Sequence, residues 1–358
     1  MTVKEAVAET LKGGLLTTEQ IVQLVSESTG AKYDSVARQL RAMRQRGEIG
    51  WDGIHYRSPG YSPEDNIEQD KPVLSDAEVD EYIELTVKRQ PIEQKLGGIK
   101  RDISVPIHES GWFGIVFGSD WHIGSVYTQL LTIRHEAQII HDTPHLYYVF
   151  LGDAMDGGIP AAPHGGILNE QNMTPEMQRQ VSERIARLIG VKMLMAASGC
   201  HAWWAIDAAD YDFIKRAFTE ATNCQYLGDG TKFYLQCDGG AEYCGVMHHK
   251  PSGHSQYNDL HPCVRVALYS EQEAEVIAIA HEHIIAVGKQ MIGGKMRYMA
   301  RTSSRKSFDR YGSKCGADSK RYDGMDVPVL LLHGEYKTGQ WITGIETAAD
   351  LVTALNAA

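Results

Sequence analysis

The chain has 358 residues, enough for about two domains of ordinary size, and its formal net charge is −11. Its six cysteines form no CxxC pair, which excludes a zinc finger and gives no sign of a disulfide framework. No apolar run approaches the roughly 18 residues of a membrane span, and the start shows no charged region followed by an apolar one. We therefore expect a cytoplasmic protein with reduced thiols and no membrane partner.

The first 58 residues carry three helical patterns, over 3–11, 17–25 and 33–46, and then a hairpin pattern over 49–56. Thr17 and Gln20 are spaced as in a helix-capping box, and Asp52-Gly53 is a strong two-residue turn signal. Three helices followed by a hairpin resemble a winged helix. We predict a small winged-helix-like domain over residues 1–58.

The third of these helices carries arginines at spacing three, namely Arg38, Arg41 and Arg44. Apolar residues at 36, 40 and 43 can face a core, so the helix is suited to enter a DNA groove. The charge of the whole chain does not argue against DNA, because the negative excess lies outside residues 1–58. The alternative is a solvated face on a protein-contact module, which would make the protein a homo-oligomer.

Residues 59–110 are predicted to form a linker rich in Pro, Gly and acidic residues, followed by a bridging helix over about 74–90. Beyond residue 110, apolar strand patterns alternate with helical ones. This alternation predicts an α/β domain over 111–345. A C-terminal helix is expected over 346–358. The predicted strands lie at 113–117, 146–151, 192–197, 233–237, 244–247, 276–280, 327–332 and 341–345, with helices at 130–141 and 175–190 between them.

Aspartates and histidines stand where five of these predicted strands end. They are Asp120 and His122, Asp153, the pair Cys200-His201, the pair His248-His249, and His281 with His283. Each short motif alone is weak evidence, because turns, helix caps and surface pairs produce the same residues. Together they offer the oxygen and imidazole ligands that two divalent ions need, and a two-metal site suits phosphate-ester hydrolysis.

The order of these motifs resembles that of the calcineurin-like metallophosphoesterase superfamily, whose signature runs DxH, GD, GNH, H and GHxH, including members that act as phage or bacterial DNA exonucleases. The resemblance covers roughly residues 111–335 and implies a layered sheet sandwich flanked by helices. It also implies two divalent ions, with Mn²⁺ favoured and Mg²⁺, Zn²⁺ or Fe as alternatives. One ion would be held by Asp120, His122, Asp153 and His283, and the other by Asp153, Cys200, one of His248 or His249, and His281.

By the same resemblance, His201 is the catalytic histidine, which hydrogen-bonds or protonates the leaving oxygen while a metal-activated hydroxide attacks phosphorus. Two positions depart from the family pattern: Cys200 replaces Asn, and Ala280 replaces Gly. A thiolate favours zinc or iron, whereas an amide oxygen suits manganese or magnesium. A buried thiol that binds no ion is the equally weighted alternative for Cys200.

The sequence thus predicts a metal-dependent phosphodiesterase that acts on DNA in the manner of a nuclease. A small-molecule phosphatase or cyclic-nucleotide phosphodiesterase is one alternative, and a non-catalytic binding or regulatory protein with a degraded second metal site is another. The basic segment 301–321, which contains Arg301, Arg305 and Lys306, is expected to hold substrate phosphates or to be a flexible solvated loop.

Overall fold

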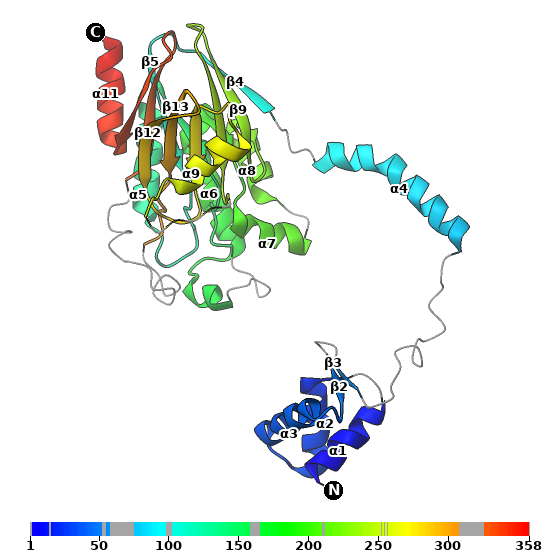
Figure 1. The fold of residues 1–358 in the computed structure, drawn as a ribbon. Helices are drawn as coiled ribbons and strands as arrows, with labels where there is room; N and C mark the ends of the chain where they lie inside the picture. Colours follow the sequence, from blue (N-terminus) through cyan, green and yellow to red (C-terminus); the bar gives the residue numbers. More distant parts are fainter. Residues whose placement is uncertain are drawn as a thin grey trace. The chain divides into compact units, whose positions relative to one another are not determined.

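The computed structural model describes residues 2–13, 16–51, 55–57, 75–97, 102–157, 165–209, 212–251, 253, 255, 257–307 and 326–357. The chain divides into two compact units, Met1–Leu96 and Gly97–Ala358. Their elements are labelled in Figure 1. We describe each unit by itself.

In its described residues the first unit contains three short α-helices, a fourth and longer α-helix, and a three-stranded antiparallel sheet with the strand order β1-β3-β2. Thr2 and Thr17 each close a capping box, which fixes where α1 and α2 begin. The predicted turn at 52–53 lies outside the described residues. The elements are α1 (Val3–Thr10), η1 (Leu11–Gly13), β1 (Leu16–Thr17), α2 (Thr18–Thr29), α3 (Tyr33–Gln45), β2 (Gly50–Trp51) and β3 (His55–Arg57), followed by α4 (Asp76–Gly97).

One face of α3 packs into the core of this unit. Val36, Leu40 and Met43 are buried there against apolar residues of α1, α2 and the small sheet. The spacing of these three residues matches the helical period, so the opposite face of α3 is left to polar side chains. Arg38 and Arg41 are exposed on it, and Arg44 is exposed at the flank of the core face, where it stacks on Trp51.

The second unit is built on two six-stranded mixed sheets, as expected for an α/β protein. One sheet has the order β15-β14-β5-β6-β7-β8 and the other β12-β13-β11-β10-β9-β4. The first comprises β5 (Trp112–Gly118), β6 (Leu146–Phe150), β7 (Met193–Ala196), β8 (Gln225–Tyr226), β14 (Pro328–His333) and β15 (Gly339–Thr343). The second comprises β4 (Asp102–Ile107), β9 (Gly230–Cys237), β10 (Glu242–His248), β11 (Val276–Ile279), β12 (Ala286–Ile292) and β13 (Lys295–Arg301).

The two sheets face one another across a shared apolar core. Ile115 and Phe117 of β5 belong to this core, whereas Val116 between them belongs to the core under the helices on the other side of the sheet. This alternation follows from the period of two along a strand. The helices of the unit are α5 (Leu130–Asp142), η3 (Gly165–Glu170), α6 (Pro175–Ile189), η4 (Gly190–Lys192), α7 (Cys200–Ala209), α8 (Phe213–Thr222), α9 (His261–Arg265), η5 (Val266–Ser270) and α11 (Ile345–Ala357).

The order of the parallel strands places several loops side by side. Strands β5, β6 and β7 are parallel neighbours in one sheet, and β10 and β11 are parallel neighbours in the other. The loops after β5, β6 and β7 are joined by backbone hydrogen bonds, from Asp120 N to Gly152 O at 2.8 Å and from Asp153 N to Ser198 O at 3.1 Å. The carboxyl ends of these strands therefore carry one continuous site.

Two parts of the second unit differ from the sequence-based expectation. Strand β4 falls inside the segment 59–110 that was expected to be linker and helix, and it pairs in parallel with β9. Its alternate residues Ile103, Val105 and Ile107 are buried, which is the pattern of an edge strand with one covered face. The antiparallel pair β12 and β13 was also not expected, because its polar and charged residues weaken the strand pattern.

Candidate metal centre

Five of the predicted metal ligands share an uncommon backbone conformation. Asp120, His122, Asp153, His281 and His283 all have a positive φ, between 47° and 79°. Non-glycine residues rarely adopt this left-handed region, and such strain concentrates at functional sites. Each residue follows the end of β5, β6 or β11, where the chain turns sharply and aims a side chain across the ends of the strands.

The first group of possible ligands consists of Asp120, His122 and His283. Nε2 of His283 lies 3.3 Å from Oδ1 of Asp120 and 3.1 Å from Nε2 of His122. Asp120 and His122 are buried, and the side chain of His283 is 20% exposed. Burial alone would raise the pKa of the Asp120 carboxyl, but His283 and His122 outweigh it and hold that pKa well below its usual range.

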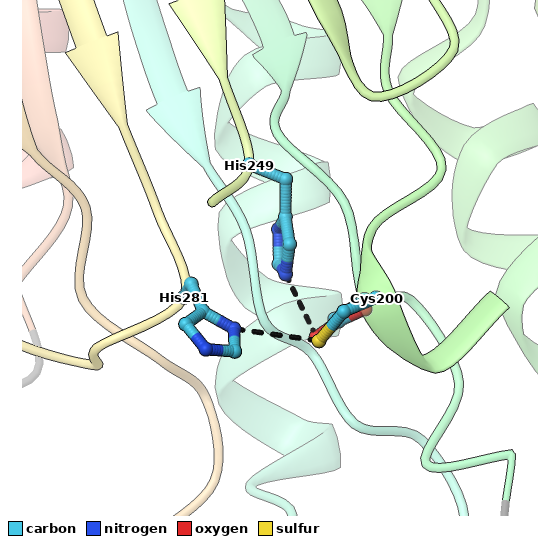
Figure 2. Close-up of side chains that lie close together, drawn as sticks. Cys200, His249 and His281 are labelled. Carbon is cyan, nitrogen blue, oxygen red and sulfur yellow. Dashed lines mark hydrogen bonds and ion pairs between the residues drawn. The ribbon is translucent and has the colours of Figure 1, made fainter. Parts of the chain in front are cut away.

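The second group consists of Asp153, Cys200, His249 and His281. Oδ2 of Asp153 lies 3.0 Å from Nε2 of His249 and 3.3 Å from Sγ of Cys200. Nδ1 of His281 lies 3.3 Å from the same sulfur. Figure 2 shows the two imidazole rings, which come from different strand ends, pointing toward Cys200. These four side chains lie within reach of one common point.

The two groups are neighbours. The backbone N–H of His281 donates to Oδ2 of Asp120 at 3.3 Å, and His281 and His283 stand on one loop. Asp153, expected to be shared by both ions, is grouped with the second set alone. Its Oδ1 is turned away, because it accepts a hydrogen bond from the backbone N of His201 at 2.8 Å.

Buried atoms without partners test whether cations fit these groups. Oδ1 of Asp120 and Nε2 of His249 are buried and make no hydrogen bond of normal geometry among the described residues, although Oδ1 faces His283 at 3.3 Å and Nε2 faces Asp153 at 3.0 Å. Nδ1 of His249 lies 2.8 Å from the carbonyl oxygen of Leu151, so Nδ1 carries a proton. Burial lowers the pKa of His249, but the carboxylate of Asp153 outweighs it and raises that pKa well above its usual range, so without a cation a proton lies between Nε2 and Asp153. The donor atoms therefore fit divalent ions.

His201 lies beside the first group, in contact with His122 and Asp156. Its Nδ1 donates to the carbonyl oxygen of Asp156 at 2.7 Å, which leaves a lone pair on Nε2 of the neutral ring. Burial lowers the pKa of His201 to about 4. The ring is therefore neutral near pH 7 and can accept a hydrogen bond or a proton at Nε2.

Asp156 and Lys306 form a buried pair behind the site. Nζ of Lys306 lies 3.3 Å from Oδ1 of Asp156, and the same oxygen lies 3.2 Å from Nδ1 of His122. A carboxylate at the second nitrogen of a ligating histidine fixes the orientation of the ring. The pairing of Asp156 with Lys306 was not predicted from the sequence, because the two residues lie 150 positions apart.

The side chains of the adjacent histidines His248 and His249 lie at different sites. His249 joins the second group, whereas His248 lines a separate cavity with Pro251, Arg265 and Tyr269. Consecutive residues at the end of an extended strand point to opposite faces of the sheet, so both rings cannot reach one site. His248, kept as a possible ligand on sequence grounds, lies outside the cluster.

The basic segment 301–321 does not form a solvated or phosphate-facing loop in the part that the structure describes, 301–307. Arg301 is buried and bonds Glu282 at 2.6 Å, and Arg305 is buried against Glu136 at 2.5 Å. Lys306 pairs with Asp156, as above. Long-range acidic partners, which local composition cannot show, neutralise all three charges. The later basic residues of the segment lie outside the described residues.

Hydroxyl groups beneath Asp120 were also not anticipated. Oγ of Ser119 donates to Oδ2 of Asp120 at 2.5 Å and lies beside the hydroxyl of Thr302. Oγ of Ser304 donates to the backbone oxygen of Asp120 at 2.8 Å. The run Thr302-Ser303-Ser304 directly follows β13, whose mixed polar and apolar sequence gave no strand signal that could have pointed to these hydroxyl groups.

Comparison with known proteins gives little further information. No family model matches the chain, and no curated protein matches it. Among solved structures the chain is similar to GAP50, described as the anchor in the inner membrane complex of Plasmodium. The two are 12% identical, the match covers 65% of this chain and 85% of that one, and the TM-score is 0.36. Within the described residues, every helix is too short or too polar to span a membrane.

Proposed function

We propose that this protein is a metal-dependent phosphoesterase that hydrolyses phosphodiester bonds in DNA. The observation that supports it most is the pair of neighbouring groups of buried and half-buried carboxylate, imidazole and thiol ligands, which converge from the ends of five strands, with strained backbone at the ligands that follow β5, β6 and β11. The order of the same residues in the chain resembles the calcineurin-like metallophosphoesterases. The geometry depends on how the side chains converge in space, whereas the resemblance depends on the order of the motifs along the sequence.

Asp120, His122 and His283 would hold one cation, and Asp153, Cys200, His249 and His281 the other. When bound, two divalent cations acidify water and offset negative charge on a transferring phosphoryl group. His201 presents its unprotonated Nε2 beside this centre and can position the attacking water or accept its proton. For His201 to act as a general acid, its pKa would first have to rise next to bound phosphate.

Exposed arginines on α3 support DNA as the substrate. Arg38 and Arg41 lie on the face of the helix that does not pack into the core, and Arg44 is exposed at the flank of the core face. Arg44 also stacks on Trp51, with its guanidinium carbon 4.3 Å from the ring centroid.

The decisive assay is cleavage of labelled single- and double-stranded DNA with Mn²⁺ or Zn²⁺. We expect His201→Ala to lower the rate by about 10²–10⁴-fold, the usual range for loss of an acid–base group. Asp153→Asn removes the charge of a proposed metal ligand and should lower the rate by weakening metal binding. Exposed residues of the same types give matched controls, Asp238→Asn and His135→Ala, which should keep the wild-type rate. Equal rates for all five proteins, or no cleavage with any metal, would end the proposal.

The arginines can be tested separately by the salt dependence of DNA binding. Arg38→Ala should weaken binding to all sequences and reduce the slope of log K against log salt by about 1 if the residue contacts a phosphate. Arg216→Ala, an exposed arginine of the second unit that pairs with Glu220, is the control. Turnover of small phosphodiesters without DNA affinity would favour the small-molecule alternative. Fewer than two bound metal ions per chain would favour the non-catalytic alternative.

A further inference from the structure

The sulfur of Cys200 lies among the atoms of the second ligand group. It is 3.3 Å from Oδ2 of Asp153 and 3.3 Å from Nδ1 of His281. Cys200 is the first residue of α7, so the side chain is anchored by a helix and by the turn that precedes it. Gly199 holds that turn at a φ of 85°. The sulfur thus sits at the start of a helix and faces the imidazoles of His249 and His281 (Figure 2).

A second, independent observation points to a ligand at the same place. Nε2 of His249 belongs to a fully buried side chain, makes no hydrogen bond of normal geometry among the described residues, and faces Oδ2 of Asp153 at 3.0 Å within this group. Its ring cannot turn to satisfy it, because Nδ1 is fixed to the carbonyl of Leu151. A buried thiol that binds no ion would not require a carboxylate and two imidazoles directed at its sulfur.

The two groups differ in number and softness of their donors. The Cys200 group offers four side chains, the number in closed zinc sites, and includes sulfur. The Asp120 group offers three, the number in zinc sites that keep an open position, and has oxygen and nitrogen only. Soft sulfur donors favour zinc or iron, whereas manganese and magnesium prefer oxygen.

We propose that Cys200 binds as a thiolate, so that its group retains a zinc or iron ion while the Asp120 group holds a more readily exchanged cation. This inference rests on the proposed function only in requiring that the centre binds metal. Binding releases the thiol proton to solvent, so affinity at this site increases with pH. Cys200 replaces a hard ligand with a soft one and thereby makes the two positions chemically unequal.

Cobalt substitution tests the proposal on the full chain. The metal-free protein, titrated with Co²⁺, should develop a near-ultraviolet sulfur-to-cobalt charge-transfer absorption. Cys200→Ser should abolish this absorption and weaken Zn²⁺ at that site by at least about 10-fold, the lower bound for losing even a residue that only supports a ligand. Cys244→Ser, another free and half-buried cysteine, is the matched control and should leave the spectrum unchanged.

Zinc X-ray absorption on the wild-type protein gives a readout that needs no variant. A sulfur neighbour at about 2.3 Å, beside nitrogen and oxygen at about 2.0–2.1 Å, is the expected result. Cobalt or zinc bound without a sulfur signal, or a signal that persists in Cys200→Ser, overturns the inference and leaves the phosphoesterase proposal standing. A protein that binds neither metal overturns both.

Discussion

Gly199 shows how little room a single residue of the centre has. A Cβ atom built there would lie 2.3 Å from both N and Oδ1 of Asp153, so an alanine must displace the carboxylate. We expect Gly199→Ala to lower metal affinity by about 10–100-fold, as for other residues that orient ligands. Isothermal titration with Zn²⁺ measures this.

Gly240 is the matched control for that substitution. Its φ of 96° is close to the 85° of Gly199, yet nothing lies within 4 Å of a Cβ atom built on it. Gly240→Ala carries the same kind of backbone strain without the steric conflict. Equal losses of zinc affinity in the two variants would show that strain, and not displacement of Asp153, is responsible.

His201 makes the stability of the metal-free protein depend on pH. Burial, opposed by Asp153 and Asp156 and assisted by His122, lowers its pKa to about 4, whereas the unfolded chain has the ordinary value of 6.5. The unfolded state therefore binds the proton first as pH falls from 6.5 to 4, and stability is lost over that window. The contribution is of the order of 2–3 kcal/mol at pH 4.5.

This dependence can be isolated by substitution. His201→Gln should lose less unfolding free energy than the wild type between pH 7 and pH 4.5, measured by urea denaturation with a chelator present. His135→Gln, which changes an exposed histidine, should follow the wild type. Identical pH profiles for all three proteins would contradict a buried neutral ring at position 201.

At the scale of the elements, the Arg305–Glu136 pair joins the loop after β13 to α5. Arg305 is 3% exposed and donates to both carboxylate oxygens of Glu136, at 2.8 and 2.5 Å. Glu136→Gln leaves a buried guanidinium without its counter-charge, a change that costs about 3–5 kcal/mol. Thermal or urea unfolding measures the loss.

Glu346→Gln is the control for that pair. It removes the acidic partner of an exposed ion pair with His135, and exposed pairs contribute at most about 1 kcal/mol. Because the backbone N of Arg305 donates to the carbonyl oxygen of Asp120 at 2.9 Å, Glu136→Gln should also weaken metal binding. A loss no larger than that of Glu346→Gln would show that Arg305 finds another partner.

The elements also show what the sequence could predict about this site. Strands such as β5, β6 and β11 are apolar on both faces, so their ends, and the polar residues just beyond them, are visible in the sequence. Because successive residues of a strand face opposite sides, the sequence could have assigned His249 and not His248 to the site if the last residue of β10 had been known. The role of Lys306 could not be predicted from the sequence. Its ion pair is with Asp156, a residue 150 positions away that only the tertiary fold brings close.

At the scale of the whole molecule, the division into two units predicts two unfolding events. The first unit has an apolar core of its own, and all the possible ligands lie in the second. In calorimetry, Zn²⁺ at about 100 times its dissociation constant should stabilise the second unit by about 2.7 kcal/mol per site and leave the other transition unmoved. One cooperative transition that shifts as a whole would contradict this independence.

The spacing of the ligands along the chain has a consequence for biosynthesis. His122 and His283 are 161 positions apart, and the loops between them depend on both sheets. If the proposed centre binds metal, a growing polypeptide therefore cannot bind the ions until most of the second unit has left the ribosome. Metal binding would then be among the last steps of folding, and we expect chains truncated before residue 281 to bind no ion at this centre, whatever the supply of ions in the cell.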